Sequence, residues 1–395
     1  MGGKAFTQRG PKGEPVVHIP RMLPSRYHQL RDYFLGVLED HFDQVLILAE
    51  APEKTDYGDI DFLVEQKFED GLFAPQIAKI VHAKRFISNG DSLSFAVKLP
   101  SEQDDTSVPF AQLDIRICQQ GTIRWQFFHD SYGDMWQILG LTIRSLGLTA
   151  TDQGLHVRIV EIEAAGGGKE TSRLFLTRDP NAAMNFMGLD ASRFARGFET
   201  EAELFDWIGQ GRLFSGYNCE KKNSNDNKRL GKRPQFERFV TEWVPNHRYI
   251  WADRVVPSRN QVLQEALDEF GLEQAHNEHL TGWRESRAEI CVLEHIAKII
   301  PLNPELEREK ERLNRTMRGM KRWVTIDNTS GSSLCLRSKP QMETSRQISF
   351  SQTAREVGED IILAWVEDHW QEVLDRERRR EKDAKKERDA AKLSI

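Results

Sequence analysis

The chain has 395 residues, of which 39% are hydrophobic and 29% are charged, and its formal net charge is −6. This length and apolar content suit about two or three folded domains, and the negative balance excludes a generally basic nucleic-acid-binding or membrane-binding protein. The four cysteines form no C-x-x-C pair, which argues against a thiolate zinc site and against a disulfide framework.

The first 24 residues are rich in Gly, Pro and Arg and contain no apolar core of the kind found in signal peptides. No later window approaches the roughly 18 consecutive apolar residues that a transmembrane helix needs. We therefore expect a flexible N-terminus over residues 1–24 and an intracellular protein, cytoplasmic or nuclear, without a membrane partner.

The region 25–177 mixes helical and strand-like patterns. In chain order these predict a helix over 25–41, strands over 44–49 and 59–65, a helix over 75–83, a hairpin turning at Asn89-Gly90, a strand over 110–118, a helix over 132–147 and a hairpin over 156–177. Strands interspersed with helices in one region indicate an α+β domain with a small mixed sheet and flanking helices.

From residue 178 to 326 the apolar spacing becomes mainly helical, which predicts a second, helical domain. The basic stretch 218–233 lacks apolar periodicity and is predicted to be a flexible loop. Residues 327–356 are rich in Ser and Thr and are expected to form a linker. Residues 357–395 begin as an amphipathic helix and become alternately charged, which predicts a solvated helical tail.

Two aspartates, Asp59 and Asp61, stand at the start of the apolar run GDIDFLVE. Side chains alternate along a strand, so both carboxylates point to one face and repel each other unless a cation lies between them. Asp114, in QLDIRIC, lies on the polar face of another predicted strand. Mg²⁺ and Mn²⁺ prefer oxygen ligands, and three carboxylates on two strands predict a site for one or two such ions.

This pattern resembles the nucleotidyltransferase superfamily with the DNA polymerase β-like fold. Its signature is a strand, a Gly-Ser turn, an h-D-h-D-h strand and a later h-D-h strand; GDIDFLV and QLDIRI match the two aspartate strands within residues 25–120. The resemblance implies metal ligation by Asp59 and Asp61, and ligation or base activation by Asp114. It also implies Mg²⁺-dependent transfer of a nucleoside monophosphate from a nucleoside triphosphate, such as ATP, to a hydroxyl of an RNA end, a protein or a small molecule.

The phosphate-binding part of the signature differs in this chain. Ala49 and Glu50 stand in place of Gly-Ser, and a glutamate there would repel a phosphate. Lys54, or Gly-Gly-Lys at 2–4, could offset this loss, and Gly58 and Arg116 are further candidates for contact with the nucleotide.

Two alternatives follow from these residues. One is a catalytically inactive member of the same fold that binds nucleotide or RNA as a regulatory module. The other is a metal-dependent nuclease that uses the same carboxylates; it is weakened because no D/E-x-K motif follows a suitable strand, VEQK at 64–67 included.

Two basic features have both a binding and a structural interpretation. Arg116, on the face of Asp114, would contact a substrate phosphate or simply form an ion pair with Asp114. The stretch 218–233 offers either a nucleic-acid backbone contact, with Tyr217 and Phe236 for stacking, or a solvated charged loop. Its basic residues are Lys221, Lys222, Lys228, Arg229, Lys232 and Arg233.

Overall fold

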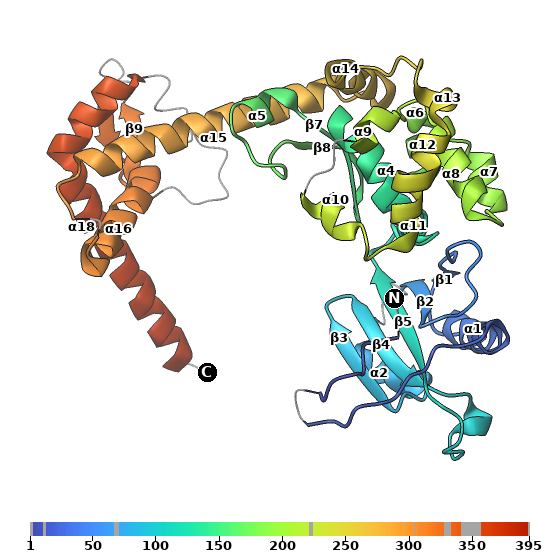
Figure 1. Ribbon diagram of the computed structural model, residues 1–395. Coiled ribbons are helices and arrows are strands. Elements are labelled where there is room, and N and C mark those ends of the chain that lie inside the picture. The colour runs from blue at the N-terminus through green and yellow to red at the C-terminus, as the bar shows by residue number, and fades with distance from the viewer. Residues whose placement is uncertain are drawn as a thin grey trace. The chain divides into compact units, whose positions relative to one another are not determined.

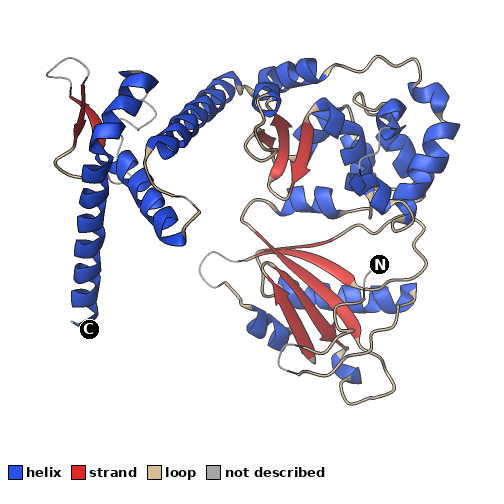
Figure 2. Ribbon diagram, turned by 60° about the vertical axis from the view of Figure 1, so that its left-hand side comes forward, coloured by secondary structure: helices blue, strands red, loops and turns tan. Residues whose placement is uncertain are grey.

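The computed structural model describes residues 3–10, 13–66, 71–220, 224–303, 305–327, 333–340 and 357–393. These residues form a mixed α+β structure (Figures 1 and 2), as the sequence predicts. The chain divides into two compact units, residues 1–276 and 277–395, rather than after residues 177 and 326. Among the described residues, the helices are too short or too polar to span a membrane.

The first sheet of residues 1–276 has five strands in the order β1-β2-β5-β4-β3. The strands are β1 Gln44–Ile47, β2 Ile60–Glu65, β3 Arg85–Asn89, β4 Ser92–Val97 and β5 Ala111–Cys118. β2 and β5 are parallel, whereas the other neighbouring strands are antiparallel. This register pairs Asp61 with Asp114, so the two predicted metal-binding strands are adjacent.

The predicted hairpin after β3 turns one residue later than expected. Asn89 pairs with Ser92, so the two turn residues are Gly90 and Asp91. Gly90 has a φ of 60°, a left-handed conformation that glycine adopts without a steric penalty.

One face of the five-stranded sheet is covered by α1 (Pro24–Glu39) and α2 (Ala74–Ile80). The helical spacing of Tyr27, Leu30, Phe34 and Leu38 puts one apolar stripe of α1 against this face. Burying that stripe excludes water from the apolar side chains of the sheet, which stabilises the domain. The polar side chains of β2 and β5 therefore point to the opposite face.

On that opposite face, α3 (Ile123–Asp130) covers the far ends of β2 and β5. The carboxylate of Glu65, which is 1% exposed, accepts hydrogen bonds of 3.0 Å from the backbone N–H groups of Thr122 and Ile123. It satisfies two donors that the start of a helix otherwise leaves unpaired. Glu65 is thus committed to holding α3, which argues against a nuclease role for the VEQK segment, and Lys67 lies outside the described residues.

The N-terminal segment lies against this sheet, in contrast to the predicted flexible N-terminus over 1–24. Phe6 is 1% exposed, and Met22 forms an antiparallel bridge with Tyr57. Arg85 of β3 donates hydrogen bonds to the carbonyl groups of Gln8 and Pro15. The described residues before α1 are therefore part of the folded unit.

A second, antiparallel sheet follows, with strands β6 Leu148–Thr151, β7 Gly154–Arg158 and β8 Arg173–Thr177. Strand β6 was not predicted. The predicted strand over 156–163 is wrong beyond residue 158, because residues 160–164 form helix α5, whose first turn carries Glu161 and Glu163. Acidic side chains are favourable at a helix N-terminus.

Short helices complete residues 1–276. They are α4 Met135–Ile143, α5 Val160–Ala164, α6 Pro180–Met187, α7 Ala191–Arg196, α8 Glu201–Gln210, α9 Gly216–Glu220, α10 Ser224–Arg229, α11 Pro234–Arg238, α12 Val244–Asn246, α13 Arg248–Trp251 and α14 Arg259–Phe270, with single turns η1 Pro100–Glu102, η2 Arg144–Leu146 and η3 Phe239–Trp243. Arg259 of α14 pairs with Glu163 of α5 and donates a hydrogen bond to the backbone carbonyl of Arg158 on β7, so contacts join the second sheet to the helical region within one unit.

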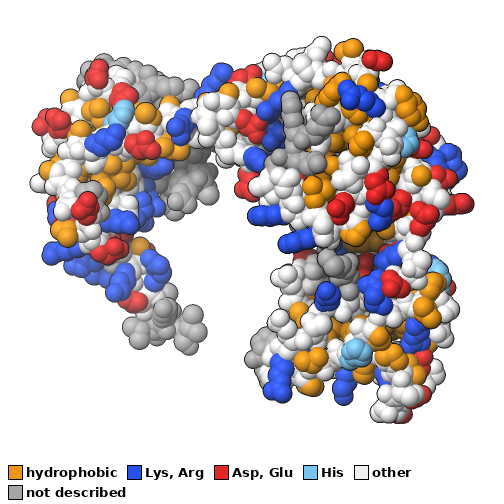
Figure 3. Space-filling model, viewed as in Figure 1, with side chains coloured by type: hydrophobic (Ala, Val, Ile, Leu, Met, Phe, Trp, Pro, Cys, Tyr) orange, Lys and Arg blue, Asp and Glu red, His pale blue; other side chains and the backbone are white. Residues whose placement is uncertain are grey.

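Over its described residues, the second unit has three helices and a hairpin: α15 Glu273–Ile299, α16 Glu307–Trp323, α18 Glu359–Leu393, β9 Val324–Asp327 and β10 Ser333–Leu336. The predicted linker over 327–356 is wrong at β10, whereas residues 328–332 and 341–356 lie outside the described residues. Toward its end, α18 carries exposed Lys and Arg side chains among acidic ones (Figure 3), as expected for the charged helical tail.

Candidate metal centre

The three predicted aspartates come together at the start of β2 and the middle of β5. Asp59 directly precedes β2, Asp61 is its second residue, and Asp114 lies beside Asp61 on β5. One carboxylate oxygen from each lies within 4.8 Å of the others, and all three residues are half-buried. Parallel pairing of β2 with β5 produces this cluster, because it sets the two aspartates in register.

Asp114 keeps one oxygen free. Its Oδ2 accepts a 2.8 Å hydrogen bond from Nε2 of Gln112, and Ser94 on β4 also hydrogen bonds to its carboxylate. Its Oδ1 is buried and has no hydrogen-bond partner within the described part of the chain. A buried oxygen without a partner costs free energy, which a bound cation would recover.

The cluster is electrostatically unfavourable without a cation. Burial raises the pKa of Asp61 well above its ordinary value, and the charges of Asp59 and Asp114 raise it further. Burial likewise raises the pKa of Asp114 to about 6, although its hydrogen bonds to Ser94 and Gln112 act in the opposite direction. Like charges in a poorly hydrated site favour the protonated form unless a metal ion neutralises them.

These residues fit a hard divalent cation. All the donors are carboxylate oxygens, the ligand type that Mg²⁺ and Mn²⁺ prefer. Oxygens bound to one Mg²⁺ at about 2.1 Å lie roughly 3 to 4 Å apart, and the three carboxylate oxygens lie within 4.8 Å of one another, which is close to that spacing. Asp59, Asp61 and Asp114 would hold the ion.

The position of the expected Gly-Ser turn is closed by backbone contacts. The N–H of Ala49 donates to Oγ of Ser131 at 3.1 Å, and its carbonyl accepts from the N–H of Tyr132 at 2.6 Å. Glu50 forms an ion pair with Lys54, which lies 4.9 Å from the centre of the Tyr57 ring. Neither the Ala49 N–H nor the Lys54 ammonium is therefore free to receive a phosphate without rearrangement.

The other two predicted nucleotide contacts are also engaged. Gly58 is buried, and Gly3 packs directly against its carbonyl group. Arg116 pairs with Asp130 at 3.0 Å and lies 3.8 Å from Asp152, so the alternative of an ion pair with Asp114 is wrong. A pocket of about 310 Å³ lined by Asp61, Asp114 and Arg116 nevertheless brings this arginine to the metal-binding face.

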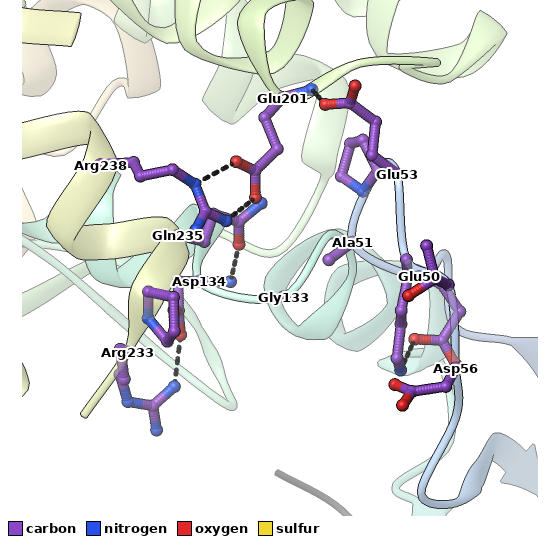
Figure 4. Close-up of a pocket in the computed structure, with 14 residues that line it drawn as sticks. Glu50, Ala51, Glu53, Asp56, Gly133, Asp134, Glu201, Arg233, Gln235 and Arg238 are labelled. Atoms are coloured by element: carbon purple, nitrogen blue, oxygen red, sulfur yellow. Dashed lines mark hydrogen bonds and ion pairs between the residues drawn. The ribbon is translucent and has the colours of Figure 1, made fainter. Parts of the chain in front are cut away.

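A larger cleft of about 800 Å³ is lined by the loop 50–56 between β1 and β2, which leads to Asp59, although none of the three aspartates lines it. Figure 4 shows Arg233, Gln235 and Arg238 on one side of it and Glu50 and Ala51 on the other. Its cations are paired with acids: Arg238 with Glu201 at 2.7 Å, Arg233 with Asp134, and Lys54 with Glu50. Five acidic and three basic residues line the cleft, which gives it a negative balance.

The predicted basic loop over 218–233 is largely helical where it is described. Helices α9 and α10 occupy most of it, while Lys221 and Lys222 lie outside the described residues. Lys228 and Lys232 are exposed, but Arg229 and Arg233 pair with Asp226 and Asp134. Phe236 is fully buried and cannot stack on a base, whereas Tyr217 is 44% exposed.

Asp226 has a structural role in this region. It is 0% exposed and pairs with Arg144 at 2.6 Å and Arg229 at 2.9 Å. We expect Asp226→Ala to lower the free energy of unfolding of the first unit by about 2 kcal/mol in urea titrations, because two guanidinium groups lose their buried partner. Lys228→Ala, on the exposed side of the same helix, is the control. Equal stability of the two variants would contradict this role.

Three polar residues near the carboxylates were not predicted: Ser94, Gln112 and Arg21. Arg21 pairs with Asp56 at 2.7 Å, and the charge of Asp59 contributes to raising the Arg21 pKa, after the Asp56 hydrogen bond and charge. Gln112 supports Asp114 directly. The i, i+2 spacing of Gln112 and Asp114 on a strand was a usable signal. Arg21 had none, because the Met22–Tyr57 bridge that places it is a long-range contact.

Comparison of the sequence with models of protein families and with curated proteins gave no match.

Proposed function

We propose that this protein is a nucleotidyltransferase with a polymerase β-like core that depends on Mg²⁺ or Mn²⁺. It would transfer a nucleoside monophosphate from a nucleoside triphosphate to a hydroxyl group and release pyrophosphate. The observation that carries the proposal is the carboxylate cluster on the adjacent parallel strands β2 and β5, with the unpaired Oδ1 of Asp114 within it.

The three aspartates of the cluster would have different roles in the reaction. A bound divalent ion would polarise the phosphoryl oxygens and stabilise the leaving pyrophosphate. Asp59 and Asp61 would hold the ion, and Asp114 would share it or accept the proton of the attacking hydroxyl through Oδ1. The bond from the hydroxyl oxygen to the α-phosphorus forms as the bond from that phosphorus to the bridging oxygen of pyrophosphate breaks.

The cleft beside the loop 50–56 is the natural place for the rest of the substrates. Its five acidic and three basic side chains disfavour a nucleic-acid backbone along this wall, because a polyanion needs a positive surface. Among the open acceptors, an RNA end, a protein or a small molecule, this balance favours a neutral or cationic group.

A catalytically inactive, nucleotide-binding or RNA-binding module is the second candidate. One observation favours it: the Ala49 N–H is occupied by Ser131, and Glu50 stands next to it. Such a protein would keep the metal ligands but bind the triphosphate without aligning it for transfer.

Labelled triphosphates distinguish the two candidates. We would incubate the protein with each labelled nucleoside triphosphate, Mg²⁺ or Mn²⁺, and pooled RNA, protein or small-molecule acceptors, beside Asp59→Ala/Asp61→Ala. Incorporation that disappears in the double variant is the expected result. Binding of a triphosphate without incorporation into any acceptor would favour the inactive module, and incorporation that survives the double variant would refute the metal centre.

A further inference from the structure

The first described residues of the chain cross the two strands that carry the aspartates. A Cβ atom on Gly3 would lie 2.5 Å from the carbonyl oxygen of Gly58, the residue before Asp59. Two residues later, the N–H of Ala5 donates a 3.1 Å hydrogen bond to Oε1 of Gln112. Phe6 then anchors the segment, because it is 1% exposed and packs beneath the guanidinium of Arg85. We refer to residues 3–6 as the N-terminal strap.

Gln112 connects the strap to the metal centre. Its side chain is buried, and its amide uses both ends: Oε1 accepts from Ala5, and Nε2 donates to Oδ2 of Asp114 at 2.8 Å. Because a backbone N–H can only donate, it fixes which end of the Gln112 amide faces Asp114. The carboxylate is thereby held with Oδ1 as its free oxygen.

Lys4 lies between the two contacts of the strap. It follows Gly3, which touches the backbone before Asp59, and precedes Ala5, which holds Gln112. Its side chain is exposed, and its ammonium makes no ion pair or hydrogen bond with any residue that the structure describes. Lys54 and Arg21, whose charges interact with Asp61 and Asp59, are by contrast paired with Glu50 and Asp56.

A polyphosphate that enters this site needs a cation besides the metal. Glu50 adds a negative charge next to the aspartates, and it acts on Asp61. The closed backbone at Ala49 leaves no N–H group there for a phosphate. A flexible lysine on the strap meets the requirement, because an ammonium binds phosphate as a point charge without fixed geometry.

We propose that the N-terminal strap completes the nucleotide site: Ala5 and Gln112 position Asp114 for the metal, and Lys4 binds the polyphosphate of the nucleotide. This inference rests on the proposed function. Ala5 and Gln112 are positioning residues that act through Asp114, whereas Lys4 contacts the substrate.

Calorimetric titration of the full chain tests the positioning role. We expect Ala5→Pro, which removes the N–H group, to weaken Mn²⁺ binding by about tenfold, the scale of losses seen when a residue that orients a metal ligand is changed. Ala5→Ser keeps the N–H group and should bind Mn²⁺ like the wild type. Gln112→Met, which removes both hydrogen bonds at similar volume, should reproduce the loss without lowering the melting temperature of the metal-free protein enough to unfold it at the titration temperature.

The role of Lys4 is tested by titrating the protein with inorganic triphosphate in saturating Mn²⁺. This ligand has no nucleobase, so only the contacts to phosphate are measured. Lys4→Met should weaken triphosphate binding about tenfold and leave Mn²⁺ affinity unchanged, because one charge-assisted contact is lost. Lys79→Met, on the exposed surface of α2 across the sheet, is the matched control.

The outcomes separate the two proposals. If the wild type binds Mn²⁺, unchanged Mn²⁺ affinity in Ala5→Pro and Gln112→Met would overturn the positioning role, and unchanged triphosphate affinity in Lys4→Met would overturn the role of Lys4. Either result would leave the proposed function standing. A wild-type protein that binds no Mn²⁺ would overturn the proposed function and the strap with it.

Discussion

Asp61→Asn is expected to stabilise the metal-free protein while it abolishes metal binding. The pKa of Asp61 is raised by burial and by the charges of Asp59 and Asp114, so its ionised form opposes folding at neutral pH. An amide of the same shape removes that charge, and we expect a melting temperature higher by roughly 3 °C. The same change removes a ligand, so Mn²⁺ affinity and nucleotide incorporation should fall by more than about 100-fold.

These opposite signs separate a metal ligand from an ordinary structural aspartate. An aspartate that stabilises the fold through an ion pair loses stability when it becomes asparagine. Differential scanning calorimetry with EDTA and with Mn²⁺ would measure both effects: Mn²⁺ should raise the melting temperature of the wild type but not of the variant. Asp104→Asn, on an exposed loop, is the control. A less stable variant that still responds to Mn²⁺ would contradict the site.

The sequence predicted the aspartate strands because each has one buried face. The alternation in GDIDFLVE and QLDIRIC separates apolar from polar side chains, and the apolar set packs on α1 and α2. It could not predict that β2 and β5 are adjacent and parallel, since pairing depends on the whole sheet. Only that pairing turns Asp61 and Asp114 into neighbours.

The basic stretch over 218–233 shows what a count of charges cannot predict. A count of Lys and Arg over 218–233 cannot reveal that Arg233 pairs with Asp134, 99 residues away, or that Asp226 is buried beneath Arg144 and Arg229. The stretch lacks an apolar period, yet it forms helices, because ion pairs rather than an apolar stripe hold α10 in place. The number of basic residues in this stretch therefore overestimated how many of them are available to bind a nucleic acid.

The support of the carboxylates by the N-terminus was unpredictable for the same reason. Gly3 and Ala5 precede Gly58 and Gln112 by 55 and 107 residues, and the segment carries no periodic signal. Its composition, rich in Gly and Pro, indicated flexibility. In the folded chain, the small side chains instead permit the close approach of Gly3 to the Gly58 backbone, which a Cβ atom would block.

The contribution of Asp114 to the stability of the metal-free protein is expected to fall as the pH rises from about 4 to 6. Burial raises the pKa of Asp114 from 3.8 to about 6, so the folded state binds a proton that the unfolded state has already released between these values. The ionisation of Asp114 therefore lowers the free energy of unfolding. This loss is absent below pH 3.8 and complete above pH 6. Its size is on the order of 3 kcal/mol, since each pKa unit corresponds to about 1.36 kcal/mol.

Urea unfolding in EDTA at several pH values would measure this slope, and Asp114→Asn isolates it. The effect of Asp114 must be separated from that of His156. Burial lowers the pKa of His156, so this residue makes the folded state gain stability as the pH rises through the same range. The difference between wild type and Asp114→Asn cancels that common effect and should grow between pH 4 and 6. In saturating Mn²⁺, the stability of the wild type should instead rise with pH, because the carboxylates must lose their protons to bind a metal. The opposite result would be a wild type that becomes more stable than Asp114→Asn as the pH rises in EDTA. It would show that the protein itself stabilises the ionised Asp114, so the cluster would not need a cation.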